Sequence, residues 1–340
     1  MVEVLLVDRA VFPRRKACGS GLSPWALRLL DELGVGARVR GEAHPIRAAI
    51  IGMGGAGPVE LRGSHEAAVL LRERFDALLV GEAVARGAHL HEGILVRSLV
   101  SADGRVAGVV TQDGVIEADA VIDCSGAHTR ISRAPRPGRT LHAIMGWYEG
   151  VAGVSDAVEL YFDPVVRPYY GWVFPETATR VNVGICYAPA AGAPNARERF
   201  DSFVVERLGT RMRAAERLGG LVGHPIATTH RPSALVGNGL LVAGEAARLV
   251  DPATAEGIYE ALSSGRLAGD VLGRVLEDGL EPTTRNLAAY GRAVRRELGW
   301  RLLAGRVVLG VLRTPVLDIA LRLGSRRGVR AGLTRLFASA

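Results

Sequence analysis

The sequence predicts an α/β protein with a Rossmann-like domain, a second domain built on an antiparallel β-sheet, and a C-terminal helical region. Apolar strands that end at an acidic residue and a tight turn occur at residues 2–8, 118–126 and 240–245, a pattern typical of parallel strands in a Rossmann sheet. Residues 141–187 instead contain several alternating strands, which favours an antiparallel sheet. Residues 283–340 are apolar, rich in arginine and predicted to be helical.

Composition indicates a globular enzyme. The 340 residues are 48% hydrophobic and 23% charged, enough for two domains and too apolar for a disordered chain. The net charge of +7 comes almost wholly from arginine, and no basic run is interleaved with aromatic residues, so no nucleic-acid partner is expected. Cys18, Cys124 and Cys186 are too scattered for a disulfide framework or a metal cluster. No uncharged run reaches the ~18 residues that cross a bilayer, and we expect a cytoplasmic protein without a metal.

The first predicted strand is Val2–Val7, and it ends at Asp8 and Arg9. A carboxylate at the end of a second Rossmann strand binds ribose hydroxyls, about 20 residues after a Gly-x-Gly-x-x-Gly turn. That turn does not precede the strand. The same pattern does occur at residues 52–57, but Pro58 and another strand follow it, so we predict a glycine-rich hairpin there. We expect that an N-terminal strand and its glycine turn are missing through a late start or a fragmented sequence.

Two helices follow. The first has Ser23 as its N-cap, Pro24 in its first turn and Gly34 as its stop. The second is predicted over residues 71–87, with one apolar face. The members of that face are Phe75, Leu78, Leu79 and Val84. Short strands are then predicted at residues 89–91, 94–100 and 105–111, with Asp103 and Gly104 as a hairpin turn.

The segment from Leu240 to Leu262 organises the rest of the chain. A strand breaks at Gly244, Glu245 follows, and a turn at Pro252 leads to a helix from about Ala255. A helix N-terminus exposes unpaired N–H groups and a partial positive charge, which suits an anion or an electron-rich ring. Val121 and Ile122 form a similar buried strand that leads into a turn at Gly126.

The second domain is predicted to contain strands at residues 142–148, 157–162, 169–174 and 180–187. Alternation places Tyr170, Trp172 and Phe174 on one face. A continuous aromatic face suits an apolar chain, although the same aromatic residues could instead fill the core of a sandwich.

Four motifs resemble the geranylgeranyl reductase family of FAD-dependent oxidoreductases, which is similar in fold to the aromatic hydroxylases. They are Tyr-x-Trp-x-Phe-Pro at residues 170–175, Val-Gly at 183–184, Cys-Gly-x-Gly at 18–21 and Arg-x-x-Phe-Asp at 72–76. The chain departs from the family in three places. Glu245 stands for the usual aspartate, Ala255 for the first glycine of the turn, and Cys186 for the last glycine of Val-Gly-x-Gly.

The resemblance implies a division of the chain and a set of site residues. The FAD-binding domain comprises residues 1–45, 65–140 and 225–278, the substrate domain 46–64 and 141–224, and a helical cap 279–340. Arg130 and Arg133 are candidates for the FAD phosphates. The expected cofactor-binding residues are Asp8, Arg9, Cys18, Gly19, Arg72, Gly126, Gly244, Glu245, Gly257 and Ile258. Cys18 and Tyr170 are the expected catalytic residues, and Tyr170, Trp172 and Phe174 the expected substrate pocket.

The resemblance also implies an activity: saturation of C=C bonds in a polyprenyl group of a lipid, a diphosphate or a prenylquinone. Reduced flavin delivers a hydride, while Cys18, Tyr170 or a bound water supplies the proton; the sequence leaves that choice open. Electrons come from NAD(P)H or a ferredoxin-type donor. The arginine-edged apolar faces after residue 283 form a cap or a peripheral dock on anionic lipid.

An FAD-dependent monooxygenase acting on an aromatic or polyketide substrate is the main alternative. A non-catalytic lipid-binding protein is another. A flavin-dependent halogenase is not expected, because the sole lysine, Lys16, belongs to the Cys-Gly loop.

Overall fold

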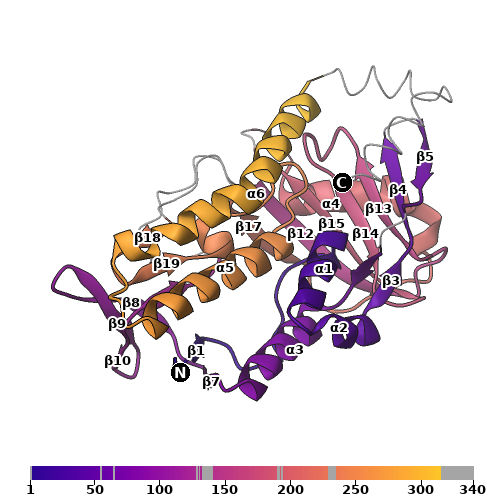
Figure 1. Ribbon diagram of the computed structural model, residues 1–340. Coiled ribbons are helices and arrows are strands. Elements are labelled where there is room, and N and C mark those ends of the chain that lie inside the picture. Colours follow the sequence, from indigo (N-terminus) through magenta and orange to yellow (C-terminus); the bar gives the residue numbers. More distant parts are fainter. Residues whose placement is uncertain are drawn as a thin grey trace. The chain divides into compact units, whose positions relative to one another are not determined.

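The computed structural model describes residues 2–53, 56–63, 66–127, 129, 131, 141–189, 192, 194–228 and 235–314. The chain divides into two compact units (Figure 1). The first unit comprises Met1–Arg14, Glu73–Arg139 and Ala227–Arg306, and the second Arg15–Arg72, Thr140–Ile226 and Val307–Ala340. The predicted domains differ from these units in two places. Residues 15–45 and 65–72, predicted to belong to the FAD-binding domain, belong to the second unit, because their strands form a small sheet there. Residues 279–306, predicted to belong to the helical cap, belong to the first unit.

The first unit contains three small sheets. Strands β1 and β7 pair in parallel, as do β11 and β19, whereas β8, β9 and β10 form an antiparallel meander and β18 pairs antiparallel with β19. Their bounds are β1 Leu5–Asp8, β7 His89–Glu92, β8 Val96–Ala102, β9 Arg105–Thr111, β10 Val115–Glu117, β11 Val121–Asp123, β18 Val236–Gly237 and β19 Leu240–Val242. The hairpin turn at Asp103 and Gly104 is confirmed, since both residues have a positive φ. Strand β10 was not predicted.

Helices α5 (Ile258–Glu277) and α6 (Thr284–Leu312) lie side by side in Figure 1, and α3 (Arg72–Ala85) begins at the boundary between the units. Two details of the prediction are wrong. Helix α5 begins three residues later than Ala255, because Ala255 has a φ of +56° and cannot belong to a right-handed helix. In α3, Phe75 and Leu78 are buried as predicted, but Val84 is 44% exposed because it lies in the last turn.

The second unit is built on one large, mostly antiparallel sheet of order β16-β12-β15-β14-β13-β4-β5, with β17 also paired to β12. The pair β4–β13 is parallel, a detail the predicted antiparallel sheet lacked. The bounds are β4 Ala48–Met53, β5 Ala56–Leu61, β12 Leu141–Glu149, β13 Ala157–Phe162, β14 Gly171–Pro175, β15 Arg180–Tyr187, β16 Glu216–Arg217 and β17 Val222–Ile226. The predicted glycine-rich hairpin is confirmed by the antiparallel pairing of β4 with β5.

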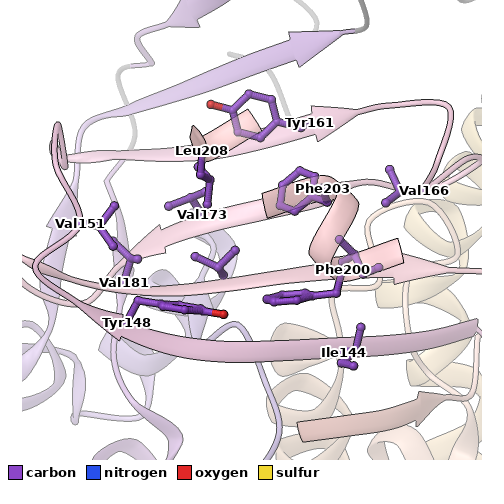
Figure 2. Close-up of a cluster of buried hydrophobic side chains, with 12 residues drawn as sticks. Ile144, Tyr148, Val151, Tyr161, Val166, Val173, Val181, Phe200, Phe203 and Leu208 are labelled. Atoms are coloured by element: carbon purple, nitrogen blue, oxygen red, sulfur yellow. The ribbon is translucent and has the colours of Figure 1, made fainter. Parts of the chain in front are cut away.

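A hydrophobic core covers one face of this sheet (Figure 2). Helix α4 (Ala196–Phe203), the π-helical turn η1 (Val204–Leu208) and the 3₁₀ turn η2 (Gly209–Met212) contribute Phe200, Phe203 and Leu208 to it. Val173 of β14 points into this core, and a Cβ on Gly171 would lie 2.3 Å from the ring of Phe203. Because side chains alternate along a strand, the intervening Trp172 and Phe174 lie on the opposite face.

A small sheet of order β2-β6-β3 and two short helices complete the second unit. Their bounds are β2 Gly21–Leu22, β3 His44–Ile46, β6 Ala67–Val69, α1 Pro24–Glu32 and α2 Gly36–Glu42. The Ser23 Oγ accepts a hydrogen bond of 3.3 Å from the amide of Ala26, which confirms the predicted N-cap. No helix in the described part of the chain is long and apolar enough to cross a bilayer.

Candidate functional site

In the first unit, two backbone turns lie next to each other at the ends of β11 and β19. The strands pair in register, and the amide of Ala243 donates to the carbonyl oxygen of Asp123 at 3.0 Å. The buried carboxylate of Asp123 closes the first turn by accepting from the amide and hydroxyl of Ser125 at 2.9 and 2.6 Å and from Thr129 Oγ1 at 2.7 Å. These bonds hold Gly126 at a φ of +82°, and no atom of the described residues beyond its chain neighbours lies within 4 Å of where a Cβ would stand. In the described part of the chain, this turn therefore presents bare backbone, as a flat cofactor requires.

The second turn is pressed against helix α5. Gly244 has a φ of +59°, its amide donates to Ser264 Oγ at 2.9 Å, and a Cβ there would lie 3.2 Å from that of Ala261. The glycine is thus explained by close packing of strand on helix. Glu245 Oε1 accepts from the amide of Ala227 at 3.1 Å.

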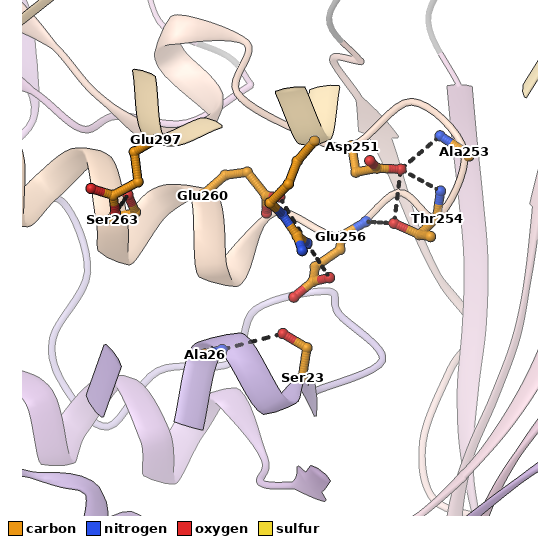
Figure 3. Close-up of polar contacts among 10 residues, drawn as sticks. Ser23, Ala26, Asp251, Ala253, Thr254, Glu256, Glu260, Ser263 and Glu297 are labelled. Carbon is orange, nitrogen blue, oxygen red and sulfur yellow. Dashed lines mark hydrogen bonds and ion pairs between the residues drawn. The ribbon is translucent and has the colours of Figure 1, made fainter. Parts of the chain in front are cut away.

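The turn before α5 is held by a network centred on Asp251 (Figure 3). Its Oδ1 accepts from the amides of Ala253 and Thr254 at 2.9 and 2.8 Å and from the Thr254 hydroxyl at 3.0 Å. Ala255 then adopts a left-handed φ at the position where the family has glycine. The N-cap residue Gly257 has no side chain to cap the helix. Backbone N–H groups of the first turn are therefore the donors that this end of α5 offers to a ligand.

Asp8 ends β1, in a different sheet of the same unit, and it already has a cationic neighbour. Arg14 lies 3.4 Å from Asp8 Oδ2 and donates to Asp76 Oδ2 at 2.9 Å. Asp76 is the buried acid of the Arg-x-x-Phe-Asp motif, so in this structure that motif positions Arg14 beside the strand end. Sequence reasoning missed Arg14, and its only signal was a position six residues after Asp8. Arg9 is exposed, and Arg72 opens α3 from the second unit.

In the second unit, the predicted aromatic residues form a continuous row. Ring centroids are 5.8 Å apart for Phe162 and Tyr170, 6.3 Å for Tyr170 and Trp172, and 6.2 Å for Trp172 and Phe174. These tilted and edge arrangements are favourable for aromatic pairs. Sequence reasoning found three members and missed Phe162, whose alternation in β13 could have revealed it.

Trp172 is the fixed point of this row. It is 4% exposed, and its Nε1 donates to the buried Oδ1 of Asn182 at 2.6 Å. On β15, a Cβ on Gly184 would lie 2.1 Å from the indole ring, and a Cβ on Gly19 would lie 3.2 Å from Nε1. Gly184 thus makes room for the indole, and Gly19 makes room for Phe174 and the indole, so that the loop that carries Cys18 packs against both rings.

Cys18 lies close to a second thiol. The amide of Ser20, a buried residue with a φ of +65°, donates to Cys18 Sγ at 3.3 Å. Burial, with a smaller contribution from Cys18, raises the pKa of Cys186 to about 12, so that thiol stays protonated. Cys186 also lies beside Tyr170, since its amide donates to the Tyr170 carbonyl oxygen at 2.8 Å.

The structure therefore brings the predicted residues together in two groups. Gly126, Gly244, Glu245, Gly257 and Ile258 belong to the turns and helix of the first unit, and Cys18, Gly19, Tyr170, Trp172 and Phe174 to one face of the second. Arg130 and Arg133 lie outside the described residues. Open space over Gly126 and the uncapped start of α5 fit a flat, anionic cofactor, and the individual contacts predicted for it remain predictions.

Comparison with known proteins identifies the family. The family model "FAD dependent oxidoreductase" matches residues 62–278. Digeranylgeranylglycerophospholipid reductase 1 of Methanopyrus kandleri is 32% identical over 293 residues, which cover 81% of this chain and 75% of that protein. A menaquinone reductase of Mycolicibacterium smegmatis is 29% identical, over 79% of this chain and 70% of its own. A geranylgeranyl bacteriochlorophyll reductase-like protein of Thermoplasma acidophilum has the same fold, with a TM-score of 0.83, 21% identity, and coverage of 96% and 86%.

Proposed function

Because this chain belongs to the geranylgeranyl reductase family of FAD-dependent oxidoreductases, we propose that it saturates C=C bonds in a polyprenyl group. The acceptor is a geranylgeranyl lipid, a prenyl diphosphate or a prenylquinone. The observation that most supports this proposal is the aromatic row on one face of the large sheet, which packs against the loop of residues 18–21. The members of the row are Phe162, Tyr170, Trp172 and Phe174. An apolar, aromatic surface suits a prenyl chain, which offers no polar group for recognition.

Each part of the chain has a proposed role. FAD, when bound and reduced, supplies a hydride. The bare turn at Gly126, Glu245 and the first turn of α5 hold the cofactor through backbone donors and a carboxylate. The aromatic row binds the prenyl chain. Tyr170, within the row, and Cys18, in the loop packed against it, are the groups that hold a proton for the second alkene carbon.

The direct test is an anaerobic reaction with a chemically reduced donor and a geranylgeranyl phospholipid or a menaquinone, with product mass as the readout. We expect two hydrogen atoms to be gained for each saturated bond. The monooxygenase alternative predicts instead NAD(P)H-dependent oxygen consumption and a product that has gained oxygen. Comparing NADPH with a reduced ferredoxin under the same conditions identifies the electron donor.

We also propose that the protein is cytoplasmic and docks on an anionic membrane through α6. The exposed face of its first half is cationic and that of its second half is apolar. The exposed arginines are Arg285, Arg292, Arg295 and Arg296, and the exposed apolar residues are Trp300, Leu303, Val307, Val308 and Val311. Trp300 is 75% exposed, and a tryptophan between arginines and aliphatic residues suits the interface of headgroups and acyl chains. A prenyl lipid or quinone substrate resides in such a membrane.

Sedimentation with vesicles tests the docking. We expect binding to vesicles that contain anionic phospholipid, weaker binding to neutral vesicles, and loss of binding in the double variant Trp300→Ser with Val307→Ser. Val205→Ser is the matched control, because Val205 is 73% exposed but lies elsewhere, on η1. Equal vesicle binding by the double variant and the control would contradict the proposal. The surface could instead join two copies of the chain. In that case the wild type would be a dimer that binds no vesicles, and the double variant would be a monomer, which would also contradict the proposal.

A further inference from the structure

One acidic side chain in the first unit has an environment unlike that of the others. Glu260 lies in the first turn of α5 and faces α6 (Figure 3). It has no exposed surface, and neither of its carboxyl oxygens has a hydrogen-bond partner among the described residues. The nearest cation in this part of the chain is Arg301, whose Nη2 lies 3.6 Å from Glu260 Oε1. A buried carboxylate left in this way is costly unless it binds a proton.

Two acids and one arginine are the charged groups that act most strongly on Glu260 among the described residues. The turn before α5 contributes Asp251 and Glu256, and α6 contributes Arg301. Arg301 Nη2 is shared, since it also lies 3.4 Å from Glu256 Oε2, and its guanidinium is placed over the ring of Tyr259 at 4.9 Å. Among the described residues, Glu260 thus lies near two further carboxyl groups and near one guanidinium that it shares with Glu256.

These surroundings act on the proton affinity of Glu260 in a definite order. Burial has the largest effect and Glu256 the next, and both raise the pKa of Glu260, as does Asp251 more weakly. The residue's own backbone amide and Arg301 act in the opposite direction, and the net pKa is about 8. Glu256, with a side chain 21% exposed, is the acidic member of the cluster that reaches solvent.

A neighbouring acid at the same helix pair shows what a purely structural ion pair looks like here. Glu297 of α6 accepts from Arg266 Nη2 at 3.0 and 2.9 Å and from Ser263 Oγ at 2.5 Å. Glu260 has no such short bonds, although it is the more deeply buried of the two. Glu297 therefore already links α5 to α6, and Glu260 is not needed to hold the two helices together.

We propose that Glu260 holds a proton at neutral pH beside the first turn of α5 and exchanges it with solvent through Glu256. Resting on the proposed function, the neutral form of Glu260 adds no negative charge to the end of α5 that would hold the anionic cofactor. Glu260 becomes a carboxylate when its proton passes through Glu256 to solvent, and it is protonated again by the same route. Glu260 is a positioning residue in this scheme, because it acts through other groups.

Infrared spectroscopy of the carboxyl C=O stretch tests the proposal without any turnover. We expect the wild type to show a protonated-carboxyl band at neutral pH that disappears with a midpoint near pH 8. Glu260→Gln should lack this band, and Glu297→Gln, the matched control from the same helix pair, should keep it. Glu256→Gln should shift the midpoint to lower pH, because a like charge is removed. That variant tests the proposal even if Glu260→Gln does not fold.

A band that persists in folded Glu260→Gln, or a midpoint that does not move in Glu256→Gln, would overturn the assignment. In flavin titrations, the dissociation constant of the wild type should rise as pH passes through about 8, whereas that of Glu260→Gln should stay the same across this range. A dissociation constant that rises equally in both proteins would overturn the role of the neutral acid at the cofactor. If the wild type does not reduce any prenyl substrate but shows the band, the proposed function fails while the buried proton stands.

Discussion

The close packing of Trp172 against Gly184 can be tested with the substitution Gly184→Ala, which shows whether this contact positions the loop that carries Cys18. The new Cβ would lie 2.1, 2.5 and 2.6 Å from three carbons of the indole ring, whereas carbon atoms pack at about 3.5–4.0 Å. The ring must retreat by roughly 1.5 Å. It cannot do so freely, because its Nε1 is hydrogen-bonded to Asn182 and lies 3.2 Å from where a Cβ of Gly19 would stand. Overpacking of this kind costs about 1–3 kcal/mol, and the retreating ring displaces the loop that carries Cys18.

Urea unfolding of the purified protein measures the cost, and tryptophan fluorescence of the folded state reports the displaced ring. We expect Gly184→Ala to lower the free energy of unfolding by about 2 kcal/mol and to reduce turnover more than flavin binding. Gly41→Ala is the control in the same unit, because Gly41 lies in α2 with no atom within 4 Å of its Cβ position. It should leave stability unchanged or raise it by up to about 1 kcal/mol. A Gly184→Ala protein as stable and as active as the control would refute this account of the motif.

Three further predictions concern buried acids. Glu159→Ala leaves Arg211 without a carboxylate that now binds it at 2.8 Å through both oxygens, and should lower the free energy of unfolding by about 3 kcal/mol in urea titrations. Burial raises the pKa of Glu176 to about 7 from an ordinary 4.5, so between these pH values Glu176 binds a proton only in the folded state. The free energy of unfolding should therefore fall as pH rises from 4.5 to about 7. Glu176→Gln should make the melting temperature depend less on pH in this range. Asp123→Ala removes the acceptor of three hydrogen bonds, so it should lower the free energy of unfolding by about 2–3 kcal/mol and also lower the flavin content. A destabilised variant with the flavin content of the wild type would show that the turn at Gly126 does not bind the cofactor.

Much of the fold follows from local sequence patterns. Strands β12 to β15 of the large sheet and helix α1 were predicted closely, because two-residue alternation and a Ser-Pro start are short-range signals. Strands β16 and β17 of the same sheet were not predicted. The true start of α5 was not, since Ala255 gives no indication that the Asp251 network forces it into a left-handed conformation. Which strands pair with each other was not predictable from local patterns either, because the parallel pair of β4 and β13 joins segments about a hundred residues apart.

The candidate site was predictable only as motifs. The resemblance correctly identified the family and FAD, and alternation correctly placed the aromatic residues on one face. The reasons for individual residues came from contacts distant in sequence. Gly184 is required by the indole ring of Trp172, Gly19 by that ring and by Phe174, and Gly244 by Ala261 of α5. Glu260 resembled an ordinary helix residue, although its spacing of four and seven residues from buried Ser264 and Leu267 does place it on the inner face.

The proposed reaction is tested most directly by the mass of a polyprenyl substrate after incubation with the flavin-loaded protein and a reduced donor in the absence of oxygen. The account predicts a product heavier by pairs of hydrogen atoms, with the added hydrogens confined to the isoprenoid chain. An unchanged isoprenoid chain, together with oxygen uptake and a hydroxylated product in air, would contradict it.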